Sequence, residues 1–224
     1  MSELEFSEGS PARLIAHRSF IYGVLAACFQ YPDEILTESI STGTLLKGLQ
    51  GIFNLALAAD DINGLAAEVS LEELESEYTQ LFEVTSPQGA VCHLYAGLHY
   101  GDRMQVMEEH VRFYNFFELH MPDTIEELPD HLCTELEFLQ FLCAQEAYAV
   151  DKDQEAQSFQ NAQQDFISRH MLRWIGSLEQ SVEKHATGPF YTSLVRVTGA
   201  FLKSEFKRLC NSEDSSVIPS IAVN

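Results

Sequence analysis

Apolar residues recur every three or four positions along most of this chain, and this spacing limits the possible fold more than any other feature. One clear run is Leu132, Leu136, Leu139 and Cys143. Residues three or four apart share one face of an α-helix, whereas a strand places alternate residues on opposite faces. The sequence contains no sustained alternation of the second kind and no tandem repeat. We therefore expect an all-α fold, a single-domain bundle of about seven or more helices.

Local signals predict where two helices in the first half of the chain begin. Ser10 before Pro11 is typical of a helix start, since a serine side chain can accept a hydrogen bond from a free amide and proline fits the first turn. Ser70 and Glu73 have the spacing of a capping box, in which each side chain bonds the other residue's backbone amide. These signals favour helices that begin after Ser10 and after Ser70.

The second half of the chain divides into further helical segments. Beyond Arg103, the predicted inward face consists of Met104, Met107, Val111 and Tyr114. Pro129 predicts the start of the next helix, residues 154–185 form an amphipathic segment, and Gly188-Pro189 separates that segment from a last helix. These limits predict a helical domain over residues 11–210, with flexible tails at 1–10 and 211–224.

The chain is strongly acidic. It has 13 Lys and Arg against 34 Asp and Glu, a formal charge of −21, and no Lys or Arg occurs from Gly48 to Asp102 or from Phe113 to Asp151. Such a chain repels the phosphates of nucleic acids and of anionic lipids and attracts cationic partners. We expect no nucleic-acid partner. The charge also fits an alternative in which the carboxylates only solvate the outer faces of helices.

The cysteines and the longest apolar runs indicate a cytoplasmic protein. The five cysteines form no CxxC pair and are odd in number, which favours a reducing compartment over a disulfide framework. The apolar run from Phe20 to Cys28 is too short to cross a bilayer. We expect no stable insertion into a membrane.

Motifs of the common enzyme classes are missing, so the sequence predicts no catalysis and no bound cofactor. It has no glycine-rich phosphate loop, no GxSxG and no HExxH. The best metal candidate is His131 with Glu135, four positions apart on one helix face. In the alternative interpretation Asp130 caps the helix and His131 lies exposed in its first turn. We favour that alternative and predict no metal site.

Three aromatic residues one turn apart are interpreted as part of the core. Phe166, His170 and Trp174 share one helix face. Histidine on an apolar face is usually neutral and hydrogen-bonded. We expect an architectural role for all three residues.

Several segments, taken in order, resemble the redox-enzyme maturation chaperones of the TorD/DmsD/NarJ type over residues 15–205. The stretch Glu77-Tyr78-Thr79-Gln80-Leu81-Phe82, followed by Pro87, is similar to that family's ExxxLF-to-proline segment. The stretch 128–138 is similar to its proline-Asp-His-Leu signature, here Pro129, Asp130, His131 and Leu132, with Glu135 and Phe138 further along. Its C-terminal pattern corresponds to Phe166, His170, Trp174, Phe190 and Tyr191.

Two further segments, 95–104 and 111–117, look closest to the branch of this family that serves periplasmic dimethyl sulfide, chlorate, selenate or ethylbenzene oxidoreductases. The resemblance implies an all-α protein without catalysis of its own. Such a chaperone binds the apoprotein of a molybdenum oxidoreductase, often through its twin-arginine leader, until the molybdopterin cofactor is inserted. It implies a monomer or a domain-swapped dimer.

Site residues follow from the same resemblance. Tyr78, Leu81, Phe82 and Pro87 would line or support a leader-binding groove, and Asp130 and His131 would form its polar end. Exposed Glu126 and Glu127 would add attraction for the leader's arginines, mainly through the association rate. Two alternatives stay open: a helical metal-binding protein or enzyme using His131 and Glu135, and a scaffold subunit that binds its partner permanently.

Overall fold

The computed structural model describes residue 7 and residues 9–52, 58–83, 89–120 and 128–216. Regular elements in these ranges are helical, apart from one isolated bridge that pairs Tyr95 with His131. This confirms the predicted all-α class. The elements are α1 (Pro11–Cys28), α2 (Glu34–Ser41), α3 (Thr44–Ile52), α4 (Ala59–Leu65), α5 (Leu71–Phe82), η1 (Ala96–Leu98), α6 (Arg103–Phe116), α7 (Leu132–Asp151), α8 (Gln157–Phe166), η2 (Ile167–Met171), α9 (Leu172–His185) and α10 (Pro189–Ser216).

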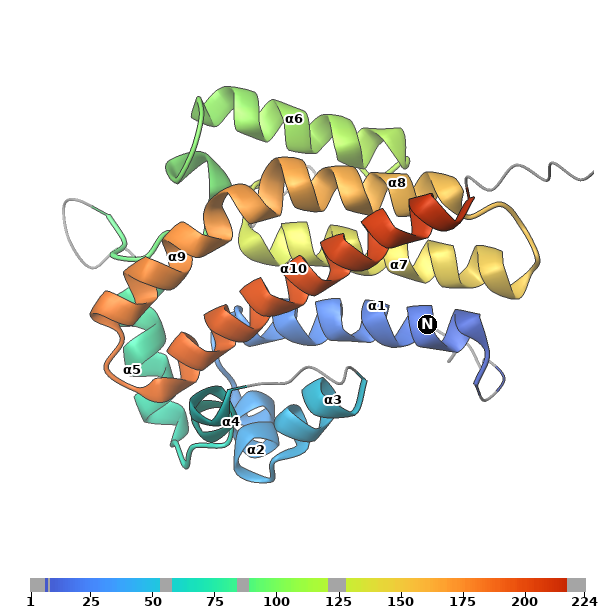
Figure 1. Ribbon diagram of the computed structural model, residues 1–224. Helices are drawn as coiled ribbons and strands as arrows, with labels where there is room; N and C mark the ends of the chain where they lie inside the picture. The colour runs from blue at the N-terminus through green and yellow to red at the C-terminus, as the bar shows by residue number, and fades with distance from the viewer. Residues whose placement is uncertain (1–6, 8, 53–57, 84–88, 121–127, 217–224) are drawn as a thin grey trace, which may run out of the picture.

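The centre of the bundle is the pair of helices α1 and α7, which lie side by side along their length (Figure 1). Ser19 on α1 donates a hydrogen bond to the carbonyl of Gln140 on α7 at 2.9 Å. Helix α10 crosses this pair, with the Tyr22 and Phe201 rings 4.8 Å apart and Arg18 3.1 Å from Glu205. The short helices α2, α3 and α4 form a group at one side of the pair, and α6 lies at the other.

The predicted helix starts in the first half of the chain are confirmed. The Ser10 side chain accepts from the amide of Arg13 at 3.2 Å. At α5 both halves of the capping box are present: Ser70 Oγ accepts from the Glu73 amide at 3.3 Å, and Glu73 Oε2 accepts from the Ser70 amide at 2.8 Å. Capping of this kind is worth about 1 kcal/mol per helix start.

Several boundaries in the second half differ from prediction. Helix α7 begins at Leu132 instead of Pro129, because Asp130 turns inward and His131 becomes the cap. The segment predicted at 154–185 is α8, the π turn η2 and α9 in continuous succession. Helix α10 continues to Ser216, past residue 210, where we expected the domain to end. No helix in the described part of the chain is long and apolar enough to span a bilayer.

Candidate functional site

A buried carboxylate joins helices α6, α7 and α9 at the centre of the molecule. Glu135 on α7 is fully buried; its Oε1 lies 2.7 Å from His110 Nε2 on α6, and its Oε2 accepts from Trp174 Nε1 on α9 at 3.1 Å. His110 Nδ1 lies 2.7 Å from the Val106 carbonyl, which can only accept, so this nitrogen carries a proton. Burial opposes a charged imidazole, but hydrogen bonding to Glu135 and its negative charge outweigh that cost and raise the pKa of His110.

The second histidine of this network has the opposite character. The rings of His170 and His110 lie 4.3 Å apart, and His170 Nδ1 lies 3.0 Å from the Tyr100 hydroxyl. Burial, followed by the positive charges of His110 and two nearby arginines, lowers the pKa of His170 to about 3. The unprotonated nitrogen of a neutral His170 can accept a hydrogen bond from the Tyr100 hydroxyl. The structure thus confirms the predicted core position of His170.

Acidification from pH 6.5 is expected to destabilise the fold through His170. Its pKa falls from 6.5 to about 3 on folding, so between these values only the unfolded chain takes up the proton. Stability contributed by His170 is therefore lost as pH decreases through this window, with a slope of at most about 1.4 kcal/mol per pH unit. Urea midpoints measured against pH should fall less steeply for His170→Gln. Equal slopes for wild type and His170→Gln, with exposed His120→Gln as control, would contradict the assignment.

Asp130 and His131 are buried, and they connect the loop before α6, through Tyr95 and Gly97, with the start of α7. Asp130 is fully buried and its Oδ2 accepts from the Gly97 amide at 2.9 Å. A Cβ at Gly97 would lie 3.0 Å from that oxygen, so any larger residue would require the contact to shift. His131 is 5% exposed, its ring meets the Tyr95 ring edge to face with centroids 4.9 Å apart, and its Nδ1 accepts from the Cys133 amide at 3.3 Å. Neither Asp130 as a helix cap nor an exposed His131 is observed.

The metal pair suggested by spacing is not brought together as a site. Glu135 is engaged by His110 and Trp174, while the His131 ring contacts Tyr95. In the ranges described above, no group of three or more His, Cys, Asp or Glu side chains could hold a metal ion. The other expected motif residues pack in the core: Phe138 and Phe166 have rings 4.9 Å apart, and Phe190 and Tyr191 have rings 5.1 Å apart.

The motif residues of α5 lie beneath the protein surface and pack against residues that form it. Tyr78, Leu81 and Phe82 are all buried, and the Tyr78 hydroxyl donates to the Phe29 carbonyl at 3.1 Å. The Phe82 ring lies 5.3 Å from Tyr191, and the Tyr78 ring lies 5.4 Å from Tyr31. Tyr31 is half exposed and carries this cluster to the surface. The predicted site residues Pro87, Glu126 and Glu127 lie outside the described residues.

Tyr31 belongs to an apolar groove between α1, α2 and α3, which we call the α1–α3 groove. Its volume is about 410 Å³. The groove is lined by Phe20, Val24, Ala27, Cys28, Gln30, Tyr31, Asp33, Ile35, Leu36, Ser39, Thr44, Leu45 and Gly48. Phe20 is 54% exposed and Ile35 is 75% exposed, which are high values for side chains of this size. Glu34 and Glu38, both exposed, lie on α2 beside these apolar residues.

Sequence reasoning did not identify this groove, although one signal was present. Ile35 and Leu36 are neighbours in the sequence, and neighbouring residues of an α-helix point about 100° apart. The two side chains on α2 therefore point in different directions. Leu36 is half-buried against the core, and Ile35 is left at the surface.

Comparison with known proteins identifies the family. The family described as nitrate reductase delta subunit matches residues 51–180. The chain is 36% identical over 197 residues to the chlorate reductase assembly chaperone protein of Ideonella dechloratans, covering 87% of this chain and 91% of that protein. The chain belongs to the nitrate reductase delta subunit family. This membership confirms the resemblance to chaperones of the TorD/DmsD/NarJ type.

Two further relatives agree with the branch of the family that the sequence suggested. The selenate reductase assembly chaperone protein of Thauera selenatis is 36% identical over 140 residues, covering 62% of this chain and 71% of that protein. The perchlorate reductase assembly chaperone protein of Dechloromonas aromatica is 28% identical over 205 residues, covering 86% and 89%. Both names, like that of the first relative, refer to reductases of oxyanions.

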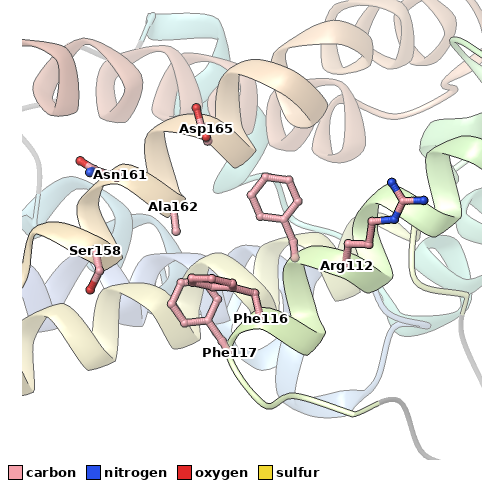
Figure 2. A pocket seen from close by; sticks show the side chains of 8 residues that line it. Arg112, Phe116, Phe117, Ser158, Asn161, Ala162 and Asp165 are labelled. Carbon is pink, nitrogen blue, oxygen red and sulfur yellow. The ribbon is translucent and has the colours of Figure 1, made fainter.

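Residues 111–117, one of the two segments that resemble a particular branch of the family, line one side of a second hollow. This hollow lies between α6 and α8, and we call it the α6–α8 hollow. Figure 2 shows Arg112, Phe116 and Phe117 on one side and Ser158, Asn161, Ala162 and Asp165 on the other. Its volume is about 470 Å³, and Phe116 at its edge is 78% exposed. In Figure 1, α6 and the α2–α3 pair lie on opposite sides of the bundle. This hollow is therefore separate from the α1–α3 groove.

Proposed function

We propose that this protein is a cytoplasmic assembly chaperone for a molybdenum-containing oxidoreductase. It binds the catalytic subunit before that subunit has received its molybdopterin cofactor, and releases it afterwards for export. The names of the relatives support this class of function. The observation that carries the proposal is the α1–α3 groove, in which large apolar side chains are exposed beside the exposed carboxylates of α2. The protein performs no catalysis in this scheme.

The chemistry of a twin-arginine leader fits the α1–α3 groove. Such a leader has arginines followed by an apolar stretch, so its binding site needs carboxylates and a hydrophobic wall. Phe20, Tyr31 and Ile35 supply the wall, and Glu34 and Glu38 add negative charge beside it. The ring of buried Tyr78 contacts both the Tyr31 ring and the Phe82 ring, and it thereby fixes the position of Tyr31 in the groove. We expect this groove to bind the leader with micromolar affinity, which corresponds to about −8 kcal/mol.

We also propose Asp130 as a leader-binding residue, although its side chain is buried. Its Oδ1 has no hydrogen-bond donor among the described residues, whereas Oδ2 accepts from Gly97. A leader guanidinium could supply the missing donor after the Gly97 contact opens, with His131 holding the start of α7. Glu126 and Glu127 lie outside the described residues, and we propose that their negative charge raises the association rate.

Binding of the catalytic subunit before and after cofactor insertion tests the proposed function. A chaperone must prefer the empty form, because it has to release a finished enzyme. A permanent scaffold subunit would bind both forms with similar affinity. The comparison therefore separates the two functions without requiring that the contact surface be known.

A further inference from the structure

The α6–α8 hollow has an exposed aromatic side chain at its edge and an apolar cavity beside it. Phe116 is 78% exposed, and the hollow next to it has a volume of about 470 Å³. Phe113 and Phe117 line the same hollow. Exposed apolar residues that adjoin one another mark a surface at which another protein binds.

Helices α6 and α8 run in opposite directions along the two walls of this hollow. Two ring contacts establish their alignment: the Phe113 and Phe166 rings lie 5.2 Å apart, and the Phe117 and Phe159 rings lie 5.8 Å apart. Residue numbers therefore rise along one wall as they fall along the other. Each level along the hollow can be assigned one residue of α6 and one residue of α8.

Two of these levels hold complementary side chains on opposite walls. Arg112 and Asp165 directly precede the residues of the first ring contact, so they lie at the same level (Figure 2). Phe116 and Ala162 lie at a second level, about one helical turn away. One level thus has a cation opposite an anion. The other has a phenyl ring opposite a methyl group, which leaves room for a ring.

A two-fold axis along the hollow would make this surface complementary to itself. The rotation keeps every residue at its own level and exchanges the two walls, so α6 of one copy comes to lie over α8 of the other. Arg112 of one copy then meets Asp165 of the other, and Phe116 meets Ala162. In such an isologous contact every interaction occurs twice.

Both charges are available for a contact of this kind. Arg112 lies 3.5 Å from Glu108, and Asp165 lies 3.8 Å from Arg169. All four side chains are more than 60% exposed, and exposed ion pairs contribute only about 0–1 kcal/mol each. These charges can therefore exchange partners at little cost.

We propose that two copies of this chain associate through the α6–α8 hollow as a two-fold dimer. Phe116 of each copy enters the hollow of the other, and Arg112 of each copy pairs with Asp165 of the other. The contact leaves the α1–α3 groove open, because α6 and the α2–α3 pair lie on opposite sides of the bundle (Figure 1). Dimerisation of this kind does not depend on the proposed function, and either can hold without the other.

Sedimentation velocity of the full chain over a range of concentrations tests the dimer. The salt concentration is about 0.15 M, at which charges more than about 8 Å apart are largely screened, so the formal charge of −21 on each copy does not prevent contact. We expect a rapid monomer–dimer equilibrium with a dissociation constant on the order of 100 μM, because a contact through one hollow forms a small interface. A monomer up to roughly five times that concentration would overturn the proposal.

The apolar half of the contact is tested by Phe116→Asp. This variant should raise the dissociation constant at least about tenfold, because it places a carboxylate in the apolar hollow of the other copy. The control is Leu14→Asp, which introduces the same charge at a 56% exposed position on α1 and should stay within about twofold of wild type. A dimer that Phe116→Asp leaves intact, as an exchange of helices between copies would be, contradicts the proposed contact.

The charged half is tested by exchanging Arg112 and Asp165. Asp165→Arg makes the chain less acidic, so it would strengthen an association that general repulsion limits. We expect about three- to tenfold weaker association instead, since it places two cations at each contact. Glu72→Arg, the same change at an exposed position on α5, should not weaken association. Arg112→Asp combined with Asp165→Arg restores each pair in reverse and should return the constant to within about twofold of wild type.

The result of the double variant decides the arrangement of the two copies. Recovery supports a direct contact between Arg112 and Asp165, because only paired residues compensate for each other's substitution. A double variant at least as weak as Asp165→Arg alone, or an Asp165→Arg variant that associates more strongly than wild type, would overturn the arrangement. The substituted side chains are exposed, and circular dichroism checks that each variant keeps the helical fold.

Discussion

Glu135→Ala is expected to lower the free energy of unfolding by about 3–5 kcal/mol, because removing one partner of a buried charged pair leaves the other uncompensated. Glu135 is fully buried and receives hydrogen bonds from His110 and Trp174. Alanine leaves both donors without an acceptor in a site closed to water. Glu135→Gln retains the size and one acceptor oxygen and should cost less.

Urea denaturation measures this effect, with Glu137→Ala as the matched control. Glu137 lies two positions further along α7 and is exposed, so its removal should change the free energy of unfolding by less than about 0.5 kcal/mol. A cycle with His110→Ala should show coupling, since the two residues share one hydrogen bond. A Glu135→Ala variant as stable as Glu137→Ala would show that the buried network does not support the fold.

Ile35→Asp is expected to weaken leader binding about 10- to 100-fold while leaving stability unchanged. Burying an isoleucine side chain against a partner contributes about 1.5–3 kcal/mol, and a carboxylate at that position would lose this and add a desolvation cost. Ile35 is 75% exposed in the free protein, so the substitution removes little packing. The affinity is measured by titration with the leader peptide.

The second apolar hollow supplies the control for Ile35→Asp. Phe116 is 78% exposed and lies on α6 opposite α8 (Figure 2), and α6 lies on the other side of the bundle from α2 and α3 (Figure 1). Phe116→Asp introduces the same charge on an equally exposed position and should leave leader affinity within about twofold. If Phe116→Asp weakens binding and Ile35→Asp does not, the leader uses the α6–α8 hollow and the α1–α3 groove is wrongly assigned.

Local sequence signals predicted much of the fold because helix periodicity and capping are short-range effects. Ser10 and Ser70 were assigned correctly, since each cap joins residues three positions apart. The start of α7 was predicted wrongly at Pro129 because the deciding contact is between Asp130 and Gly97, 33 positions away. No local pattern contains that contact.

The inward face of α6 shows a second limit of pattern analysis. We predicted Met104, Met107, Val111 and Tyr114, whereas the buried residues are Val106, His110 and Tyr114. Met104 is 63% exposed. Counting apolar residues overlooks a histidine that is buried because a carboxylate from another helix binds it. His110 could have been found from its four-residue spacing to both Val106 and Tyr114.

The candidate site was only partly accessible to sequence reasoning. The resemblance singled out Tyr78, Leu81 and Phe82, which are buried beneath the groove surface. The exposed residues, Phe20 and Ile35, come from helices that meet only in the folded protein. Glu77 was quoted within its motif but received no role, since the amides that it binds, those of Thr187 and Gly188, lie 110 and 111 positions away in the sequence.

The most direct measurement of the central claim is calorimetric titration of this protein with its client's catalytic subunit, purified once without the molybdopterin cofactor and once with it. We expect micromolar binding of the empty subunit, about −8 kcal/mol, and binding at least about tenfold weaker after loading, a difference of about 1.4 kcal/mol. Equal affinity for both forms would identify a permanent subunit. Binding of neither form would contradict the assignment as an assembly chaperone.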